Sequence, residues 1–182
     1  SFPFLAHASM EPLNCVVQIS KDGCEVWNGE QNQTGDQFAI AKVLGLPPDR
    51  IKLNQLFVGG SFGRRANPQS DYVLEAVFIA KALASGATAG APVKLQWTRE
   101  DDMQGGFYRP LYVHRVSAGL DGQGKPLAWQ QRIVGQSIVV GTPFEAMMKN
   151  GIDPTSVEGA ANLPYLVPNL QVELHSPKPG IP

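Results

Sequence analysis

The segment Val58-Gly-Gly-Ser-Phe-Gly-Arg-Arg65 constrains the fold and the chemistry of this chain more than any other part of it. It follows residues 51–58, which read as a strand, and precedes residues 71–84, which read as a helix. Its closely spaced glycines allow positive φ and bring backbone N–H groups near a ligand, while its two arginines attract anions. The segment therefore predicts a loop that binds a phosphate or a polar cofactor edge. The alternative is a tight structural turn with solvent-exposed arginines.

Spacing and composition exclude several other classes of protein. The loop is not a P-loop, because no Gly-Lys-Ser/Thr follows it, and it lacks the G-x-G-x-x-G spacing of dinucleotide-binding proteins. A formal net charge of -1 argues against nucleic acid as a general partner, because phosphate binding needs an excess of Lys and Arg. No apolar run approaches the ~20 residues of a transmembrane segment. A chain of 182 residues suits one domain, or one domain with an extended arm.

The residues before the glycine-rich segment predict a hairpin. Strands at 15–19 and 24–27 join at Asp22-Gly23, which sets Cys24 opposite Lys21 and places Cys15 roughly 20 Å away, at ~3.3 Å per residue. A disulfide needs Cα atoms within about 7 Å of each other. We therefore expect both cysteines to be free thiols.

Two main helices are predicted. The first runs from about Gly35 to Leu44, where Thr34 and Gln37 have the spacing of a capping box and Gly45 ends the helix. Its apolar face carries Phe38, Ala41 and Leu44. The second helix covers about Asp71–Ala84, with Ser70 as its N-cap.

The remainder of the chain mixes strands with loops. Further strands are expected at residues 93–97, 112–120, 126–140 and 170–175, with a hairpin turn at Asp121-Gly-Gln-Gly124. Prolines crowd the segment after Gly141. The pattern predicts an α+β fold of mixed sheets with hairpins and two main helices, arranged as a two-layer sandwich. We expect a domain at residues 1–140 and an extended Pro-rich arm at 141–182.

Three other polar features are candidates for chemistry. Gln31 ends a strand before a helix, where its amide can bind a ligand or simply be solvated. Glu11 is either a buried hydrogen-bonding carboxylate or a charge before Pro12. Residues 99–102, Arg-Glu-Asp-Asp, read as a solvated turn. We find no arrangement of residues that forms a nucleophile, so residues alone indicate an α+β domain with one anion or cofactor loop.

Several motifs in order resemble the molybdenum hydroxylases, the xanthine dehydrogenase and aldehyde oxidase family, and most of all the isoquinoline 1-oxidoreductase beta-subunit type. The resemblance spans nearly the whole chain. It is carried by His7-Ala-Ser-Met-Glu-Pro-Leu-Asn14, Glu25-Val-Trp-Asn-Gly-Glu-Gln-Asn-Gln33, Gly59-Gly-Ser-Phe-Gly-Arg-Arg65, Pro92-Val-Lys-Leu-Gln-Trp-Thr-Arg-Glu-Asp-Asp102, Tyr108-Arg-Pro110, Leu120-Asp-Gly-Gln-Gly124 and Gly135-Gln-Ser-Ile138.

The resemblance implies that the chain is the first molybdopterin-binding region of a large subunit. Gln31 matches the family glutamine beside an oxo ligand of molybdenum. The family loop that packs on the metal and the pterin corresponds to Gly60, Ser61, Phe62 and Gly63. An adjoining cofactor-binding arginine corresponds to Arg64. No catalytic or metal-ligating residue is implied within the chain. The family's catalytic glutamate lies far toward the C-terminus, beyond the matching residues.

The implied reaction is hydroxylation of an N-heterocycle or an aldehyde with oxygen from water. The implied cofactor is molybdopterin with molybdenum, in its cytosine dinucleotide form. Electrons would leave through a [2Fe-2S] partner subunit, with a cytochrome c as a further acceptor, and the remainder of the large subunit completes the site. The resemblance leaves the compartment open between cytoplasm and periplasm and leans toward export.

Two residues depart from the family pattern. Ser61 replaces the usual middle glycine, and Ala66 stands where xanthine-oxidising members place a substrate-binding glutamate. The second change disfavours purines and favours aldehydes or simple heterocycles. We expect the 182-residue piece alone to be inactive and to bind cofactor weakly or not at all. The alternative function is a non-catalytic binding or scaffold domain that keeps the glycine-rich loop.

Overall fold

A computed structural model describes residues 4–178 and residue 180, and these fall into two compact units. We call residues 5–108 the N-terminal unit and residues from 109 onward the C-terminal unit. The division between these units lies at Tyr108/Arg109, and the domain boundary expected at 140/141 stays a prediction. The physical reason is strand pairing, because the hairpin after residue 109 pairs with a later strand and not with the first sheet.

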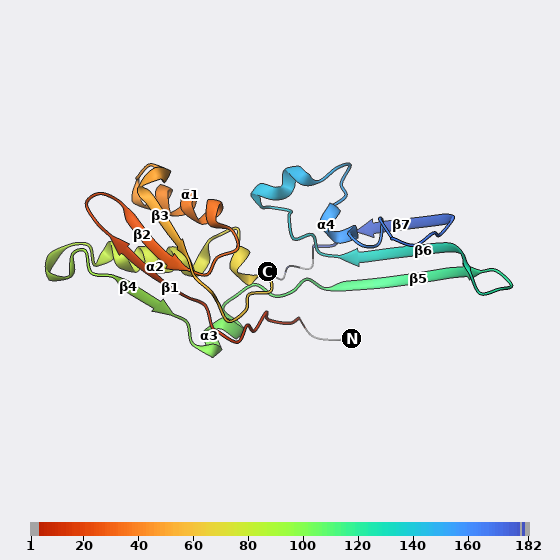
Figure 1. Cartoon of the computed structure of the whole chain (residues 1–182), viewed down its shortest axis with the longest axis horizontal. Helices are drawn as coiled ribbons and strands as arrows, with labels where there is room; N and C mark the ends of the chain where they lie inside the picture. The colour runs from red at the N-terminus through yellow and green to blue at the C-terminus, as the bar shows by residue number, and fades with distance from the viewer. Residues whose placement is uncertain (1–3, 179, 181–182) are drawn as a thin grey trace. The chain divides into compact units, whose positions relative to one another are not determined.

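The N-terminal unit contains a four-stranded sheet in the order β3-β2-β1-β4 (Figure 1). Its strands are β1 (Asn14–Ile19), β2 (Cys24–Asn28), β3 (Ile51–Gln55) and β4 (Val93–Gln96). The predicted hairpin of β1 and β2 is confirmed, but its turn has four residues, because the Ser20 amide bonds the Gly23 carbonyl at 2.9 Å. Cys24 therefore pairs with Ile19 and not with Lys21. Both cysteines are free, as predicted.

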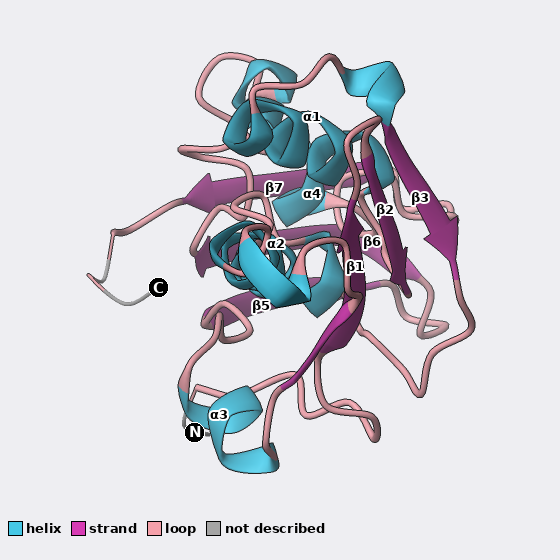
Figure 2. Cartoon of the chain, turned by 90° about the vertical axis from the view of Figure 1, so that its left-hand side faces the viewer, coloured by secondary structure: helices cyan, strands magenta, loops and turns pink. Residues whose placement is uncertain are grey.

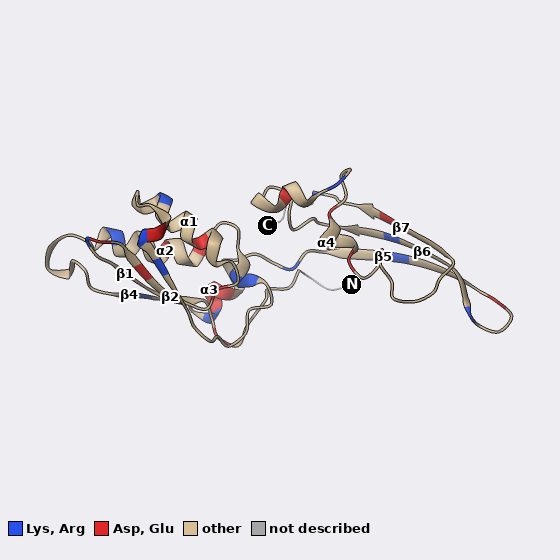
Figure 3. Cartoon of the chain, turned by 45° about the horizontal axis from the view of Figure 1, so that its top comes forward, with Lys and Arg blue, Asp and Glu red and all other residues tan. Residues whose placement is uncertain are grey.

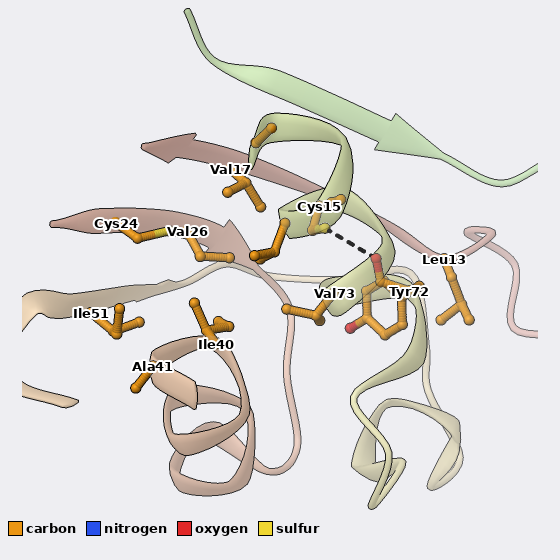
Figure 4. Close-up of a cluster of buried hydrophobic side chains, with 13 residues drawn as sticks. Leu13, Cys15, Val17, Cys24, Val26, Ile40, Ala41, Ile51, Tyr72 and Val73 are labelled. Atoms are coloured by element: carbon orange, nitrogen blue, oxygen red, sulfur yellow. Dashed lines mark hydrogen bonds between the residues drawn. The ribbon is translucent and has the colours of Figure 1, made fainter. Parts of the chain in front are cut away.

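Two 12-residue helices, α1 (Gln33–Leu44) and α2 (Asp71–Ala82), pack against this sheet (Figure 2). The parallel pairing of β2 with β3 needs a crossover, and α1 supplies it. The shared core is apolar and fully buried. Figure 4 shows it between strands and helices, with Cys15, Val17 and Val26 from the strands facing Ile40 and Val73 from the helices.

The predicted helix ends are only partly right. Gly45 ends α1 in the left-handed region with φ 68°, as expected. The capping box is wrong, because α1 begins at Gln33 with Asn32 as an N-cap whose side chain makes no cap bond. Gln37 instead donates to the carbonyls of Pro48 and Ile51, each at 3.0 Å. Ser70 precedes α2 as predicted, but its side chain does not cap the helix.

The predicted apolar face of the first helix is only partly right. Ala41 is buried and Leu44 packs against the core, as predicted, but Phe38 is 58% exposed. Asp36 and Ile40 are buried in its place. The helix is therefore rotated so that a carboxylate faces inward. Shorter helices complete the unit: η1 (Pro48–Arg50), η2 (Arg64–Ala66), η3 (Gly86–Thr88) and α3 (Arg99–Gln104).

The C-terminal unit is built on a three-stranded sheet in the order β5-β6-β7. Its elements are β5 (Tyr112–Leu120), β6 (Pro126–Gly135), η4 (Pro143–Met147), α4 (Pro154–Val157) and β7 (Asn169–His175). The predicted hairpin at Asp121–Gly124 is confirmed, while β6 ends at Gly135 and not at residue 140. The Pro-rich segment after residue 141 includes β7, which pairs in parallel with β6.

The whole arrangement confirms the α+β class, with mixed sheets and hairpins. Basic and acidic residues are interspersed in both units (Figure 3). Among the described residues no helix is long and apolar enough to cross a membrane.

Candidate cofactor-binding loop

The glycine-rich loop, residues 59–65, follows β3 after three exposed apolar residues and leads into η2. Gly60 and Gly63 both have φ of 95°, which glycine adopts at little cost. Phe62 lies between them with φ 55°, and its side chain is 64% exposed. A non-glycine residue in the left-handed region costs about 1–3 kcal/mol, and such residues cluster at ligand sites. The loop thus holds an aromatic ring outward at an energetic cost.

Gln31 contacts this loop directly. Its Oε1 accepts hydrogen bonds from the Ser61 hydroxyl and, at 3.1 Å, from the Gly63 amide. Because a backbone amide can only donate, the atom facing Gly63 must be the oxygen, and this fixes the orientation of the side-chain amide. The Nε2 group then has no acceptor within the described part of the chain. Two sequence-predicted site segments, thirty positions apart in the chain, are therefore joined, with an amide donor left available.

Glu11 holds the start of the loop. Its Oε2 accepts the Gly59 amide at 2.9 Å, and its own amide donates to the Gly59 carbonyl at 3.2 Å. A Cβ on Gly59 would lie 2.7 Å from the Glu11 Cβ, so glycine is required by close approach. The Gly59 N–H bond, with help from Asn14 and Arg65, lowers the pKa of Glu11. Of the two readings of Glu11, the hydrogen-bonding carboxylate is therefore correct, although its side chain is only partly buried.

Arg64 is buried inside the N-terminal unit. It is 3% exposed, and its Nη2 and Nη1 contact the Asp71 carboxylate at 2.6 and 3.3 Å. Its guanidinium carbon lies 5.5 Å from the Trp97 ring centroid and 5.8 Å from that of Phe107. The alternative of a turn with solvent-exposed arginines is thus wrong. The guanidinium is committed to Asp71, so contact between Arg64 and a cofactor remains a prediction.

Arg65 is buried as well, at 2% exposure. Its Nη2 lies 3.4 Å from the Glu11 Oε2, and its Nη1 donates to the Gly29 carbonyl at 3.4 Å. Its amide bonds the Ser61 hydroxyl at 3.2 Å, and its carbonyl accepts the Gln31 amide at 3.3 Å. This one residue therefore ties the N-terminal segment, the β2–α1 junction and the glycine-rich loop together.

The loop has amide donors to offer a ligand. The amides of Gly59, Gly63, Arg64, Arg65 and Ala66 all have partners within the protein. Within the described part of the chain, no acceptor faces the amides of Gly60 and Ser61. Gly63 is exposed, and a Cβ built on it meets nothing within 4 Å. Free amides, open space and the Gln31 Nε2 fit a polar group rich in acceptors, as the edge of a pterin cofactor is.

The two departures from the family pattern also have places in the structure. The Ser61 hydroxyl is bonded to Gln31 and to the Arg65 amide, so it points into the protein. Ala66 is half-buried at the end of η2, where its amide donates to the Gly63 carbonyl at 3.0 Å.

The prediction of a solvated turn at residues 99–102 is wrong, because these residues belong to α3. Thr98 and Asp101 form a capping box, which starts this helix. Arg99 donates to the carbonyls of Ser9 and Met10 at 2.7 and 2.9 Å, and pairs with the buried Asp102 at 2.7 Å. The segment thus supports the N-terminal stretch that carries Glu11.

A buried pair of acids was missed by sequence reasoning. Glu30, next to Gln31, is 6% exposed, and Asp36, in the first turn of α1, is 2% exposed. Burial is the main cause that raises the pKa of both, and the neighbouring Asp36 raises the pKa of Glu30 further. The available signal was the spacing of Asp36 and Ile40, which are four positions apart and therefore lie on the same face of the helix. A face defined by apolar residues alone leaves out Asp36.

The family model of the molybdopterin cofactor-binding domain matches residues 1–176, and the chain belongs to this family. Among curated relatives, it is 36% identical over 148 residues to a membrane-bound aldehyde dehydrogenase [pyrroloquinoline-quinone] of Gluconacetobacter polyoxogenes. That match covers 81% of this chain and 18% of the relative. It is 37% identical over 114 residues to the isoquinoline 1-oxidoreductase subunit beta of Brevundimonas diminuta, covering 62% of this chain and 14% of the relative.

A solved structure shows the same fold. The aldehyde oxidoreductase from Desulfovibrio gigas superposes with a TM-score of 0.66 at 22% identity, over 93% of this chain and 17% of that one. The relative from Brevundimonas diminuta is named as a subunit. The chain spans less than a fifth of the length of these relatives, so it corresponds to part of their cofactor-binding region.

Proposed function

We propose that this chain supplies one wall of the molybdopterin site in a molybdenum hydroxylase that oxidises an aldehyde or a simple N-heterocycle. The observation that carries the proposal is the pair of hydrogen bonds that the Gln31 Oε1 accepts from the Ser61 hydroxyl and the Gly63 amide. These bonds set the Gln31 Nε2 donor beside a loop whose Gly60 and Ser61 amides face no acceptor in the described chain. These three donors, which face no acceptor in the described chain, match the acceptor-rich edge of the cofactor.

In this proposal the residues of the chain bind and orient the cofactor. The amides of Gly60 and Ser61 and the Gln31 Nε2 donate hydrogen bonds to it, and the exposed Phe62 ring packs on it. Arg64 holds the loop in place through its salt bridge with Asp71. The bound cofactor supplies the hydroxylation chemistry, with oxygen from water, and the protein holds it in a fixed orientation.

The substrate class rests on Ala66. Its methyl group provides no carboxylate to bind a purine, so we infer an aldehyde or simple heterocycle as the substrate. The names of the relatives agree, because one is an aldehyde dehydrogenase and another an isoquinoline oxidoreductase. Steady-state kinetics with matched aldehyde, isoquinoline and xanthine substrates test this assignment. Preferred turnover of xanthine would overturn it.

The partners follow from the same proposal. A relative named as a subunit supports an assembly with other subunits. We propose a [2Fe-2S] subunit, a cytochrome c acceptor, the cytosine dinucleotide form of the cofactor and export to the periplasm. Co-purification with iron analysis, nucleotide release by acid hydrolysis, and cell fractionation test these points separately.

The decisive experiment is metal and pterin analysis of the full-length complex. We expect molybdenum and pterin in the wild type and loss of both in a Gln31→Ala, Gly63→Ala double variant. The control is Gln18→Ala with Gly90→Ala, because the Gln18 side chain donates to the Gly90 carbonyl of another glycine-containing loop at 2.9 Å. Full molybdenum in the Gln31 variant would refute the assigned roles. A quinone in place of molybdenum, as one relative's name specifies, would refute the cofactor. Absence of any cofactor would favour a scaffold domain.

The chain alone should show no turnover, because the resemblance places the catalytic glutamate outside it. Appreciable hydroxylation by the isolated 182-residue chain would contradict this expectation.

A further inference from the structure

The buried acids Glu30 and Asp36 lie next to the proposed cofactor contact. Glu30 directly precedes Gln31, and its Oε2 is buried with no hydrogen-bond partner among the described residues. Asp36 lies four positions beyond the N-cap of α1 and is 2% exposed. If both carboxyl groups are ionised, neither can donate a hydrogen bond to the other, and buried acceptor oxygens are left without a partner.

The surroundings of the pair stabilise one negative charge and not two. Ser70 and Asn28 provide hydrogen bonds to Asp36 and Glu30, respectively, and the N-terminal ends of α1 and α2 favour an anion. Ionisable groups that interact with members of the pair from neighbouring elements are Cys15 of β1 and Asp71 and Tyr72 of α2. Arg65 of η2 acts on Cys15 and Tyr72.

None of those groups neutralises a second charge. Asp71 adds negative charge near Asp36, and its carboxylate is paired with Arg64. Arg65, the nearby cation, is directed to Glu11 and to the Gly29 carbonyl. Cys15 and Tyr72 are buried, and burial raises the pKa of both side chains, so they stay neutral.

The backbone of Glu30 and Gln31 is held from two sides. The Gln55 side chain accepts the Glu30 amide at 3.3 Å and donates to the Glu30 carbonyl at 3.2 Å. The Gln31 amide donates to the Arg65 carbonyl at 3.3 Å. The side chain of Glu30 is therefore one residue away, along a restrained backbone, from the contacts of Gln31 with Ser61 and Gly63.

We propose that Glu30 and Asp36 share one proton at neutral pH, and that this pair is a positioning device that holds Gln31 against the glycine-rich loop. The shared proton gives the pair its missing donor. Loss of that proton places two charges in a buried site and pushes the β2–α1 junction apart. The positioning role rests on the proposed function, whereas the shared proton does not.

The pH dependence has a definite sign. Burial and Asp36 raise the pKa of Glu30 to about 8, from an ordinary value of 4.5. A carboxyl with a raised folded-state pKa contributes stability that is fully present below the ordinary value and is lost as the pH rises through the folded value. The stabilising effect of the pair should therefore fall between about pH 5 and about pH 8.

The first test is made on the full-length complex by difference infrared spectroscopy and thermal unfolding. Wild type should show the carbonyl band of a protonated carboxyl at pH 7, and Glu30→Gln and Asp36→Asn should each lose it. Between pH 6 and pH 9, the Tm of Glu30→Gln should increase by about 2 °C or more relative to the Tm of wild type. The control is Glu100→Gln, which changes an exposed glutamate of α3. It should keep the band, and its Tm relative to wild type should not change with pH.

The second test reads positioning without turnover. Molybdenum retention after gel filtration should fall at least about twofold in wild type between pH 7 and pH 9, and remain constant in Glu30→Gln. Parallel loss in both proteins, or no protonated-carboxyl band in wild type, would overturn the inference. If Glu30→Gln does not fold, the wild-type band and its loss in Asp36→Asn decide the question. A wild-type complex without molybdenum that still shows the band refutes the proposed function but leaves the shared proton supported.

Discussion

Two loops of the N-terminal unit have similar composition and opposite character. Residues 59–65 and residues 85–92 both contain two glycines with positive φ, at Gly60 and Gly63 in the first and at Gly86 and Gly90 in the second. Both follow a regular element and include a 3-10 helix or lead into one. Glycine content and backbone conformation therefore do not distinguish a ligand-binding loop from a connector.

The difference lies in what holds each loop. Residues 85–92 are exposed throughout and are held mainly by short-range bonds, such as Ala89 to Gly86 at 3.2 Å and Thr88 to Leu83 at 3.1 Å. Their one long-range polar contact among the described residues is Gln18. Residues 59–65 receive side chains from distant segments and bury two arginines.

The comparison teaches that the contacts that hold the loop, and not its glycines, distinguish the proposed binding loop from the connector. Buried ion pairs are costly to form and costly to break, so they specify one conformation of the segment that contains them. A loop fixed in this way can present amides at set positions, which a cofactor needs for tight binding. A loop held by local turns has no such requirement.

The largest effect should come from breaking an ion pair beneath the first loop. Arg64→Ala leaves Asp71 without its partner and opens a cavity between Trp97 and Phe107, so it should lower the free energy of unfolding by about 2–4 kcal/mol. Urea denaturation of the chain measures this. The matched change in the second loop is Thr88→Ala, expected to cost about 1 kcal/mol or less. Equal losses in the two variants would remove the distinction between the loops.

Alanine at matched glycines should separate stability from cofactor binding. Gly63 and Gly90 have φ of 95° and 79°, and a Cβ on either meets nothing within 4 Å. Each substitution should therefore cost about 1–2 kcal/mol through backbone strain alone. Only Gly63→Ala should also reduce molybdenum content in the full-length complex, because its methyl group occupies the space above the loop. A similar reduction in Gly90→Ala would show that the effect is one of stability.

Removing the two glutamines that reach these loops provides a more local comparison. Gln31→Ala deletes the acceptor of the Gly63 amide and should speed exchange of that amide about fivefold, or about 1 kcal/mol. Gln18→Ala deletes the donor to the Gly90 carbonyl and should leave the Gly63 amide unchanged. Hydrogen exchange measured by mass spectrometry reads both. Unchanged exchange at Gly63 in the first variant would contradict the bond.

The smallest effect should be the acid response of Glu11. The Gly59 amide lowers the pKa of Glu11, so its contribution is present above the ordinary value of 4.5 and lost as the pH falls through the lowered folded value. Protection of the Gly59 amide should therefore decrease at acid pH relative to that of Ala89. Glu11→Gln should remove this pH dependence. A Gly59 amide that loses protection equally in both proteins would argue against the role of the carboxylate.

The sequence predicted most of the secondary structure, and two segments that it proposed for the site, at Gln31 and at the glycine-rich loop, are in contact in the structure. Alternating apolar residues and turn signals located both hairpins, and helical spacing located α2, because these patterns are local. The predicted face of α1 was wrong at Phe38, because the buried carboxyl of Asp36 breaks the rule that charged residues face solvent. The solvated turn at residues 99–102 was wrong for a similar reason, since Asp102 is buried against Arg99.

The glycine-rich loop shows where local reasoning ends. Its glycines predicted an unusual backbone, and the structure agrees at Gly60 and Gly63. Its arginines looked equally able to meet solvent or an anion, because a sequence does not show which distant carboxylates approach them. The fold brings Asp71 and Glu11 to these arginines and buries both guanidinium groups.

The sequence by itself determined the elements and the family of this protein, because hydrophobic period, turn residues and ordered motifs are properties of neighbouring positions. Only the tertiary structure decided which groups meet. Gln31 joins Ser61 because the parallel pairing of β2 with β3 brings the β2–α1 junction beside the loop that follows β3. Such contacts depend on chain topology and burial, which no local pattern encodes.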